Sequence, residues 1–195
     1  MSIISRTNLT MAAVATSLLL SAPFAAAADV GLGVNLNTNS YGGNFGYGIS
    51  MPIRFGNISV EPEVAYNQST YDNNSTTPSN VYRSKYEQYS IETGIFVHKE
   101  VAPSLEIYGG GRIGAYGYKY SNGYPNNPGA NNESRNHGYM AGPTVGAEYF
   151  FDKQVSVGLD VSLLYQSGSQ SSSGGDGVDS SQINLQGRAK LRFYF

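Results

Sequence analysis

The residues that could do chemistry in this sequence are mostly charged side chains placed at alternate positions. Arg188, Lys190 and Arg192 alternate with apolar residues, and Glu61 and Glu63 repeat the spacing. Residues two apart share one side of an extended strand. Eleven charged residues are predicted on one interior face: Arg54, Glu61, Glu63, Glu92, Glu106, Arg112, Glu148, Asp160, Arg188, Lys190 and Arg192. Six acids facing five bases predict ion pairs and small networks, since an unpaired buried charge is costly.

Catalytic and metal chemistry have little support in the sequence. The chain has two histidines, His98 and His137, and no cysteine. His137 follows Ser134 by three residues, but a nucleophile and base also need an orienting group. Asp176 and Asp179 lack the full spacing of a calcium loop. We predict no catalytic residue, no metal site and no cofactor, and therefore a protein that is not an enzyme.

Eight segments with the two-residue period of β-strands must position the charges. They are residues 29–36, 44–55, 58–66, 89–97, 105–116, 139–151, 155–165 and 182–195. In each segment, apolar residues occupy the face opposite the charges. Several segments reach the ~9–11 residues with which a tilted strand crosses a bilayer. The sequence therefore predicts an all-β fold, an eight-stranded antiparallel transmembrane β-barrel.

The connections between these segments alternate in length. Those after the second, fourth and sixth segments are short, beginning with a tight turn at Gly56 and Asn57. Residues 67–88, 119–138 and 166–181 are long and rich in Asn, Ser, Gly and Tyr, a composition typical of irregular solvated chain. Short periplasmic turns and long extracellular loops are the pattern of an outer-membrane barrel. A ten-stranded variant would need an extra hairpin within one of the long segments.

Periodicity alone leaves the assignment of the two faces open. In a soluble barrel or sandwich the apolar face would form the core, whereas in a membrane barrel it meets lipid. Aromatic residues at both ends of the apolar stripe favour the membrane, where they form interfacial girdles. They are Phe55, Tyr149, Phe151, Phe193 and Phe195 at one end, and Tyr47, Tyr66, Tyr89, Tyr139 and Tyr165 at the other. An eight-stranded interior is just wide enough for side chains, so we expect a plugged lumen.

The first 27 residues have the pattern of a secretory signal peptide. Residues 11–20 are apolar and are followed by small residues, with cleavage predicted after Ala27. The apolar run is shorter than the ~20 residues of a membrane-spanning helix. We predict a signal peptide over 1–27 and a barrel domain over 28–195. The barrel domain has 11 basic and 14 acidic residues, a net charge of −3, which does not suggest a nucleic-acid partner.

The sequence resembles small bacterial outer-membrane β-barrel proteins, the class of the OmpA transmembrane domain and of OmpX and Ail. The resemblance covers essentially the whole mature chain. In that class a terminal phenylalanine with apolar residues at alternate positions before it is the assembly signal read by the barrel-insertion machinery. Leu191, Phe193 and Phe195 match this signal, with Lys190 where a glycine is common. The resemblance implies location in the outer membrane and contact with its lipid and lipopolysaccharide.

The resemblance does not specify a function, because one fold hosts many. We expect a structural or surface-interaction role, with the extracellular loops available to an extracellular ligand. The alternative is a small low-conductance porin-like channel. An outer-membrane lipid-modifying enzyme is a third candidate, for which the sequence offers no motif.

Overall fold

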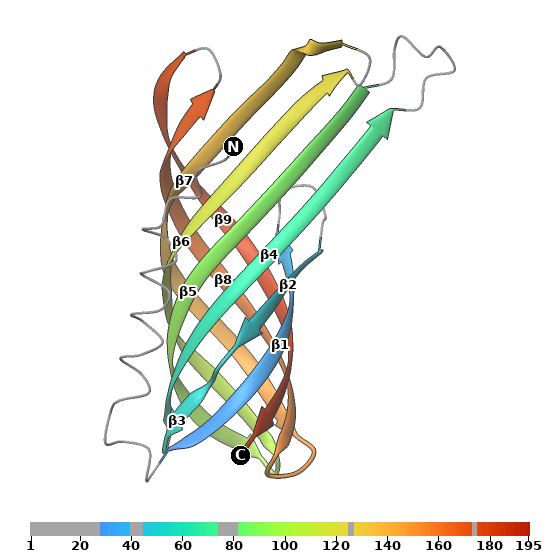
Figure 1. The fold of residues 1–195 in the computed structure, drawn as a ribbon. Helices are drawn as coiled ribbons and strands as arrows, with labels where there is room; N and C mark the ends of the chain where they lie inside the picture. Colours follow the sequence, from blue (N-terminus) through green and yellow to red (C-terminus); the bar gives the residue numbers. More distant parts are fainter. Residues whose placement is uncertain (1–27, 40–44, 74–81, 125–126, 173–174) are drawn as a thin grey trace.

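The computed structural model describes residues 28–39, 45–73, 82–124, 127–172 and 175–195, and these are almost entirely β-strand (Figure 1). The predicted signal peptide lies outside the described residues. The strands are β1 (Asp29–Asn39), β2 (Phe45–Ser50), β3 (Ile53–Phe55), β4 (Ile58–Asn73), β5 (Tyr82–Ala102), β6 (Leu105–Tyr124), β7 (Asn127–Phe150), β8 (Val155–Ser172) and β9 (Gly175–Tyr194). The described part of the chain contains no helix long and apolar enough to cross a membrane.

The strands form one closed antiparallel ring. From β4 to β9 each strand pairs with the next along the chain, and β9 pairs with β1 from Gly31 opposite Tyr194 to Asn39 opposite Gln186. Both β2 and β3 lie between β1 and β4, so they are two halves of one barrel strand. The ring therefore has the eight strand positions that the sequence predicts.

Pro52 interrupts the second barrel strand, which the sequence predicts as continuous. Neither Pro52 nor Pro62, which lies beside the break on β4, has an N–H to donate to a strand partner, and β2 ends at Ser50 while β3 begins at Ile53. The neighbouring strands compensate, because the Pro52 carbonyl accepts from Gly31 N–H at 2.8 Å and Met51 N–H donates to the Pro62 carbonyl at 2.9 Å. The register with β1 and β4 is the same on both sides of the break, so the ring stays closed.

Three tight turns close one end of the barrel. Gly56 adopts a positive φ of 62° between β3 and β4, and Ser104 adopts 65° between β5 and β6. Between β7 and β8, the Asp152 carboxylate accepts hydrogen bonds from the Gln154 and Val155 amides at 2.7 and 2.8 Å. These are the short connections that the sequence predicts, and the C-terminus lies at the same end (Figure 1).

The other end is built from extended hairpins, which corrects the prediction of irregular loops. β4 and β5 stay paired out to Asn73 opposite Tyr82, β6 and β7 to Tyr124 opposite Asn127, and β8 and β9 to Ser172 opposite Gly175. Figure 1 shows β4–β7 rising side by side well past β1 and β2. Tyr, Thr and Ser can form a strand wherever cross-strand partners are available. The polar composition of these segments was therefore not sufficient to predict irregular loops.

The two faces of the ring differ as the alternation predicts. Aliphatic and aromatic side chains cover the outer wall, for example Ile113 and Leu159, which are 64% and 66% exposed. The buried side chains facing inward are largely polar or charged. Ile53 is an exception on the apolar face, since it is only 8% exposed beside the break at Pro52.

Candidate functional site in the barrel lumen

Glu61 of β4 binds three cations from two other strands. Its Oε1 accepts a hydrogen bond from Lys190 Nζ at 2.7 Å and another from Arg112 Nη2 at 3.1 Å. Its Oε2 accepts from Arg192 Nη2. The contact with β9 joins residues more than one hundred positions apart, 129 for Lys190 and 131 for Arg192. Glu61 therefore connects β4 with the non-adjacent strands β6 and β9 through the lumen.

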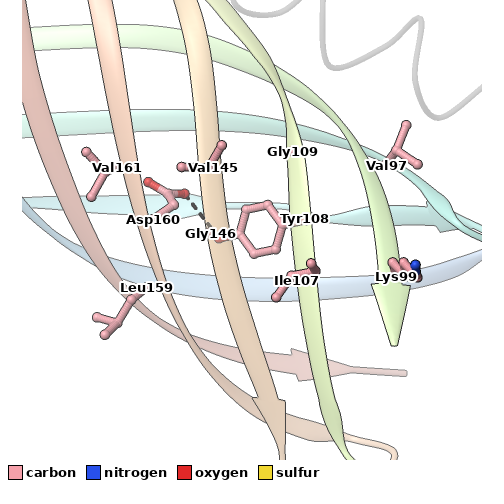
Figure 2. Close-up of a pocket in the computed structure, with 10 residues that line it drawn as sticks. All are labelled: Val97, Lys99, Ile107, Tyr108, Gly109, Val145, Gly146, Leu159, Asp160 and Val161. Atoms are coloured by element: carbon pink, nitrogen blue, oxygen red, sulfur yellow. Dashed lines mark hydrogen bonds between the residues drawn. The ribbon is translucent and has the colours of Figure 1, made fainter. Parts of the chain in front are cut away.

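Asp160 of β8 shares two of these cations. Its Oδ2 lies 2.5 Å from Lys190 Nζ and 3.2 Å from Arg112 Nη2. The Tyr108 hydroxyl donates to the same oxygen at 3.3 Å, the contact drawn as a dashed line in Figure 2. Lys190 and Arg112 thus bridge Asp160 and Glu61, and none of the four charges lacks a partner.

Arg188 of β9 gathers a further group of acids. Its Nη2 donates to Glu92 Oε2 at 2.5 Å. Its Nε and Nη1 lie 3.5 Å from Glu63 and 3.5 Å from Asp160. Glu63 also accepts from Arg112 Nη1 at 3.1 Å. Because Glu63 and Asp160 each contact two arginines, these pairs form one continuous network with those around Glu61.

Glu148 of β7 extends the network toward the short-turn end. It accepts from Arg192 Nη1 at 2.6 Å, from Tyr194 hydroxyl at 2.9 Å and from Ser156 hydroxyl at 2.5 Å. Hydrogen bonds from both charged and neutral donors satisfy this carboxylate, as a buried charge requires.

Nine charged side chains make up this lumenal charge network, and each residue is at most 3% exposed. They are Glu61, Glu63, Glu92, Arg112, Glu148, Asp160, Arg188, Lys190 and Arg192. Side chains that lined an open water-filled channel would be exposed to it. The middle of the lumen is therefore packed solid by ion pairs.

Aromatic rings fill the space between the charges. Phe96 is 5.0 Å from the Arg112 guanidinium and 5.8 Å from Lys190 Nζ, within cation–π range. The Phe96 and Tyr108 rings are 5.3 Å apart. A Cβ built on Gly94 would lie 2.4 Å from the Phe96 ring, and one on Gly146 would lie 2.4 Å from the Tyr108 ring. Glycine at both positions makes room for the two rings.

A smaller polar cluster lies at the short-turn mouth of the lumen. Arg54 Nη2 is 2.5 Å from Glu106 Oε2, His98 Nδ1 is 3.2 Å from the same oxygen, and His98 Nε2 is 2.7 Å from Ser59 Oγ. His98, Glu106 and Glu148 offer three potential metal ligands within 4.8 Å of one another. Arginines already bind both carboxylates, so the cluster closes the mouth as an ion-pair and hydrogen-bond group.

An apolar layer lies on the opposite side of the lumenal charge network. Tyr116, Met140 and Leu164 form a buried cluster, with Tyr118 packed against it. The Tyr118 ring is 5.6 Å from the ring of Tyr86. The lumen is therefore filled at two levels, by charges in the middle and by this apolar layer nearer the hairpins.

All eleven charged residues predicted on the interior face point to one side of the wall. Nine belong to the lumenal charge network, while Arg54 and Glu106 form a pair nearer the short-turn mouth. Sequence reasoning missed Phe96, His98 and Ser59 as members of the interior. Their even-numbered spacing from Gly94 or Glu61 was the available signal.

Comparison with known proteins supports the membrane assignment of the two faces. The sequence matches the outer membrane protein beta-barrel domain family over residues 11–193. No protein with a curated description matches it. A major outer membrane protein of Thermus thermophilus has a similar structure, with 15% identity, a TM-score of 0.59, and coverage of 87% of this chain and 100% of that one.

The attachment invasion locus protein Ail of Yersinia pestis is also similar, with 13% identity, a TM-score of 0.52, and coverage of 86% of this chain and 96% of that one. At these identities the likeness shows the fold alone. The family match spans nearly the whole chain, and the closed ring with an apolar outer wall agrees with it. The chain belongs to the outer membrane protein beta-barrel domain family.

Proposed function

We propose that this protein is a structural outer-membrane barrel that acts at the cell surface through its projecting hairpins, and not by transport or catalysis. The observation that carries the proposal is the combination of a filled lumen with strands that continue beyond the outer aromatic girdle. β4–β9 project as a paired sheet on the extracellular side. The part of the barrel available to a partner is therefore this sheet.

The polar cluster at the short-turn mouth contains a serine, a histidine and a carboxylate joined by hydrogen bonds, and their surroundings favour a structural role for them. Ser59, His98 and Glu106 are connected in the order that a catalytic triad uses. Ser59 is only 2% exposed, so its hydroxyl is enclosed by the wall. Glu106 is shared with Arg54. These contacts favour a group that holds neighbouring strands together at the periplasmic mouth over an esterase site.

A cluster of charges lies on the outer face of the sheet above the extracellular girdle. Lys119 and Arg135 are directly opposite each other on β6 and β7. Arg135 precedes Tyr139 by four residues, and this even spacing places both side chains on the lipid-facing side. Arg135 lies roughly 13 Å from Tyr139 along the strand, on the side of the hairpin end. This height corresponds to the headgroups of the outer leaflet.

The cluster has an excess of positive charge. Lys119 and Arg135 lie 2.8 and 2.6 Å from the carboxylate of Glu133. Glu87 on β5 is directly opposite Lys119, and its carboxylate lies 2.8 Å from Lys85, so the cluster has three cations and two carboxylates. The hydrogen bond from Lys119 lowers the pKa of Glu133 below its usual value, so the carboxylate is ionised at neutral pH. Exposed pairs of this kind are weak, and either cation can turn toward a phosphate. We infer that lipopolysaccharide, whose phosphates lie at this height, is the partner.

The experiment compares lipopolysaccharide binding of the folded barrel with that of Lys119→Gln plus Arg135→Gln. Each cation near a charged membrane surface contributes about 1 kcal/mol, so the double variant should bind about 30-fold more weakly at low salt. Titration of purified lipopolysaccharide into barrels in nanodiscs measures the change.

The matched control is Lys153→Gln, which removes an exposed lysine from the periplasmic turn between β7 and β8. It should leave the affinity unchanged. Equal affinity of the double variant and the wild type would contradict the proposed partner.

A further inference from the structure

The outer wall contains a hollow of about 600 Å³ between β5, β6, β7 and β8. Figure 2 shows the residues that line it: Val97, Lys99, Ile107, Tyr108, Gly109, Val145, Gly146, Leu159, Asp160 and Val161. The rim consists of side chains that face lipid, while Tyr108, Gly146 and Asp160 contribute to the floor. The hollow therefore opens toward the bilayer and not toward the lumen.

Gly109 creates the hollow. It lies on the lipid-facing side of β6, two residues after Ile107, and a Cβ added there would have no heavy atom within 4 Å. Val97 pairs with Gly109 on β5, and Val145 pairs with it on β7. Both valines are exposed. The missing side chain thus leaves a recess between two raised apolar positions.

Lys99 is the cation at the periplasmic edge of the hollow. It is exposed, pairs with Ile107, and lies three residues before the end of β5 at Ala102. The other charged lining residue, Asp160, belongs to the lumenal charge network and contacts Lys190 at 2.5 Å. Among the lining residues, Lys99 is therefore the one charge that a ligand arriving from the lipid side would meet.

We propose that the hollow binds one anionic phospholipid of the periplasmic leaflet, with an acyl chain in the recess at Gly109 and the headgroup phosphate beside Lys99. The apolar walls match an acyl chain, since burying methylene groups is favourable. A lysine stem can lie along an apolar wall and place its ammonium at the interface, where long cationic side chains lie. Charge complementarity selects an anionic headgroup over a zwitterionic one.

The test uses the full barrel in nanodiscs with equal amounts of phosphatidylglycerol and phosphatidylethanolamine, followed by release into detergent and native mass spectrometry. The wild type should retain one phospholipid, enriched in phosphatidylglycerol. Gly109→Leu, which fills the recess, should abolish retention. Lys99→Ala should retain lipid but lower the preference for phosphatidylglycerol about fivefold.

Two controls separate a bound lipid from general contact with the bilayer. Ala141→Leu adds a similar bulk, three carbon atoms in place of four, to the lipid-facing side of β7 outside the hollow. Lys153→Ala removes an exposed lysine from the same end of the barrel. Both should behave as the wild type. The proposal would be overturned if the wild type retained no phospholipid. It would also be overturned if phospholipid retention fell as much in the two controls as in Gly109→Leu and Lys99→Ala. Heat-modifiable electrophoretic mobility verifies that each variant is folded, and Lys99→Ala tests the headgroup contact independently of Gly109→Leu.

Discussion

Individual residues in the lumenal charge network stabilise the barrel because most of them have several partners. Arg188 contacts three carboxylates, those of Glu92, Glu63 and Asp160. Glu148 accepts from Arg192, Ser156 and Tyr194. Removing either residue leaves buried groups without a partner, which costs more than the pair itself contributes.

We therefore expect Arg188→Ala and Glu148→Ala each to lower the free energy of unfolding by about 3–5 kcal/mol. Urea unfolding of barrels in lipid vesicles measures the change, followed by circular dichroism because the chain has no tryptophan. Ser171→Ala in the projecting hairpin is the control, since Ser171 is exposed. Equal urea midpoints for the three variants would show that the network contributes little.

The sequence predicted which residues face the lumen but not which acid meets which base. Alternation determines the side of the wall, so all eleven charges could be placed from spacing alone. Their pairing depends on how far each strand is shifted against its neighbours and on the strand tilt. These two properties bring Arg192 next to Glu61, which is 131 positions away in the sequence. The hydrogen bond between His98 and Ser59 depends on the same strand shifts, because the two residues are on different strands.

At the scale of elements, the period-two pattern was sufficient to predict every barrel strand, and it failed at their ends. The strands continue through residues that the composition assigned to loops, because each hairpin supplies its own cross-strand partners. The break at Pro52 was not predicted, because the two-residue alternation continues through it, although the missing N–H of the proline was an available signal. The assembly signal at Leu191, Phe193 and Phe195 stays a prediction, although all three side chains are exposed on β9 and beyond it.

Close packing of strands depends on glycine at particular positions, and adjacent glycines on β6 offer a matched pair. A Cβ on Gly110 would lie 1.9 Å from the Ile95 carbonyl oxygen, whereas one on Gly109 would meet nothing within 4 Å. We expect Gly110→Ala to cost about 1–3 kcal/mol of folding free energy and Gly109→Ala to stay within about 0.5 kcal/mol of the wild type. Urea midpoints in vesicles measure both, and a reversed order would mean that β5 and β6 separate easily.

At the scale of the whole molecule, the filled lumen predicts that the barrel does not conduct ions. The lumenal charge network and the layer of Tyr116, Met140 and Leu164 occupy successive levels of the interior. Planar-bilayer recordings of folded protein should show no discrete current steps at moderate voltage. Reproducible steps that change in selectivity when Arg112 is replaced by glutamate would instead establish the channel alternative.

The position of the cations along the chain has a consequence for the order of assembly. β9 supplies Arg188, Lys190 and Arg192, three of the four cations in the lumenal charge network, whereas the five carboxylates are on β4, β5, β7 and β8. A sheet that had formed only as far as β8 would carry an acidic inner surface with Arg112 as its one network cation. Arrival of the last strand thus closes the ring and changes the formal charge of the network from −4 to −1 in the same step. A nascent barrel that lacks this strand would keep its acids hydrated and its lumen open, which would distinguish an unfinished molecule from a finished one.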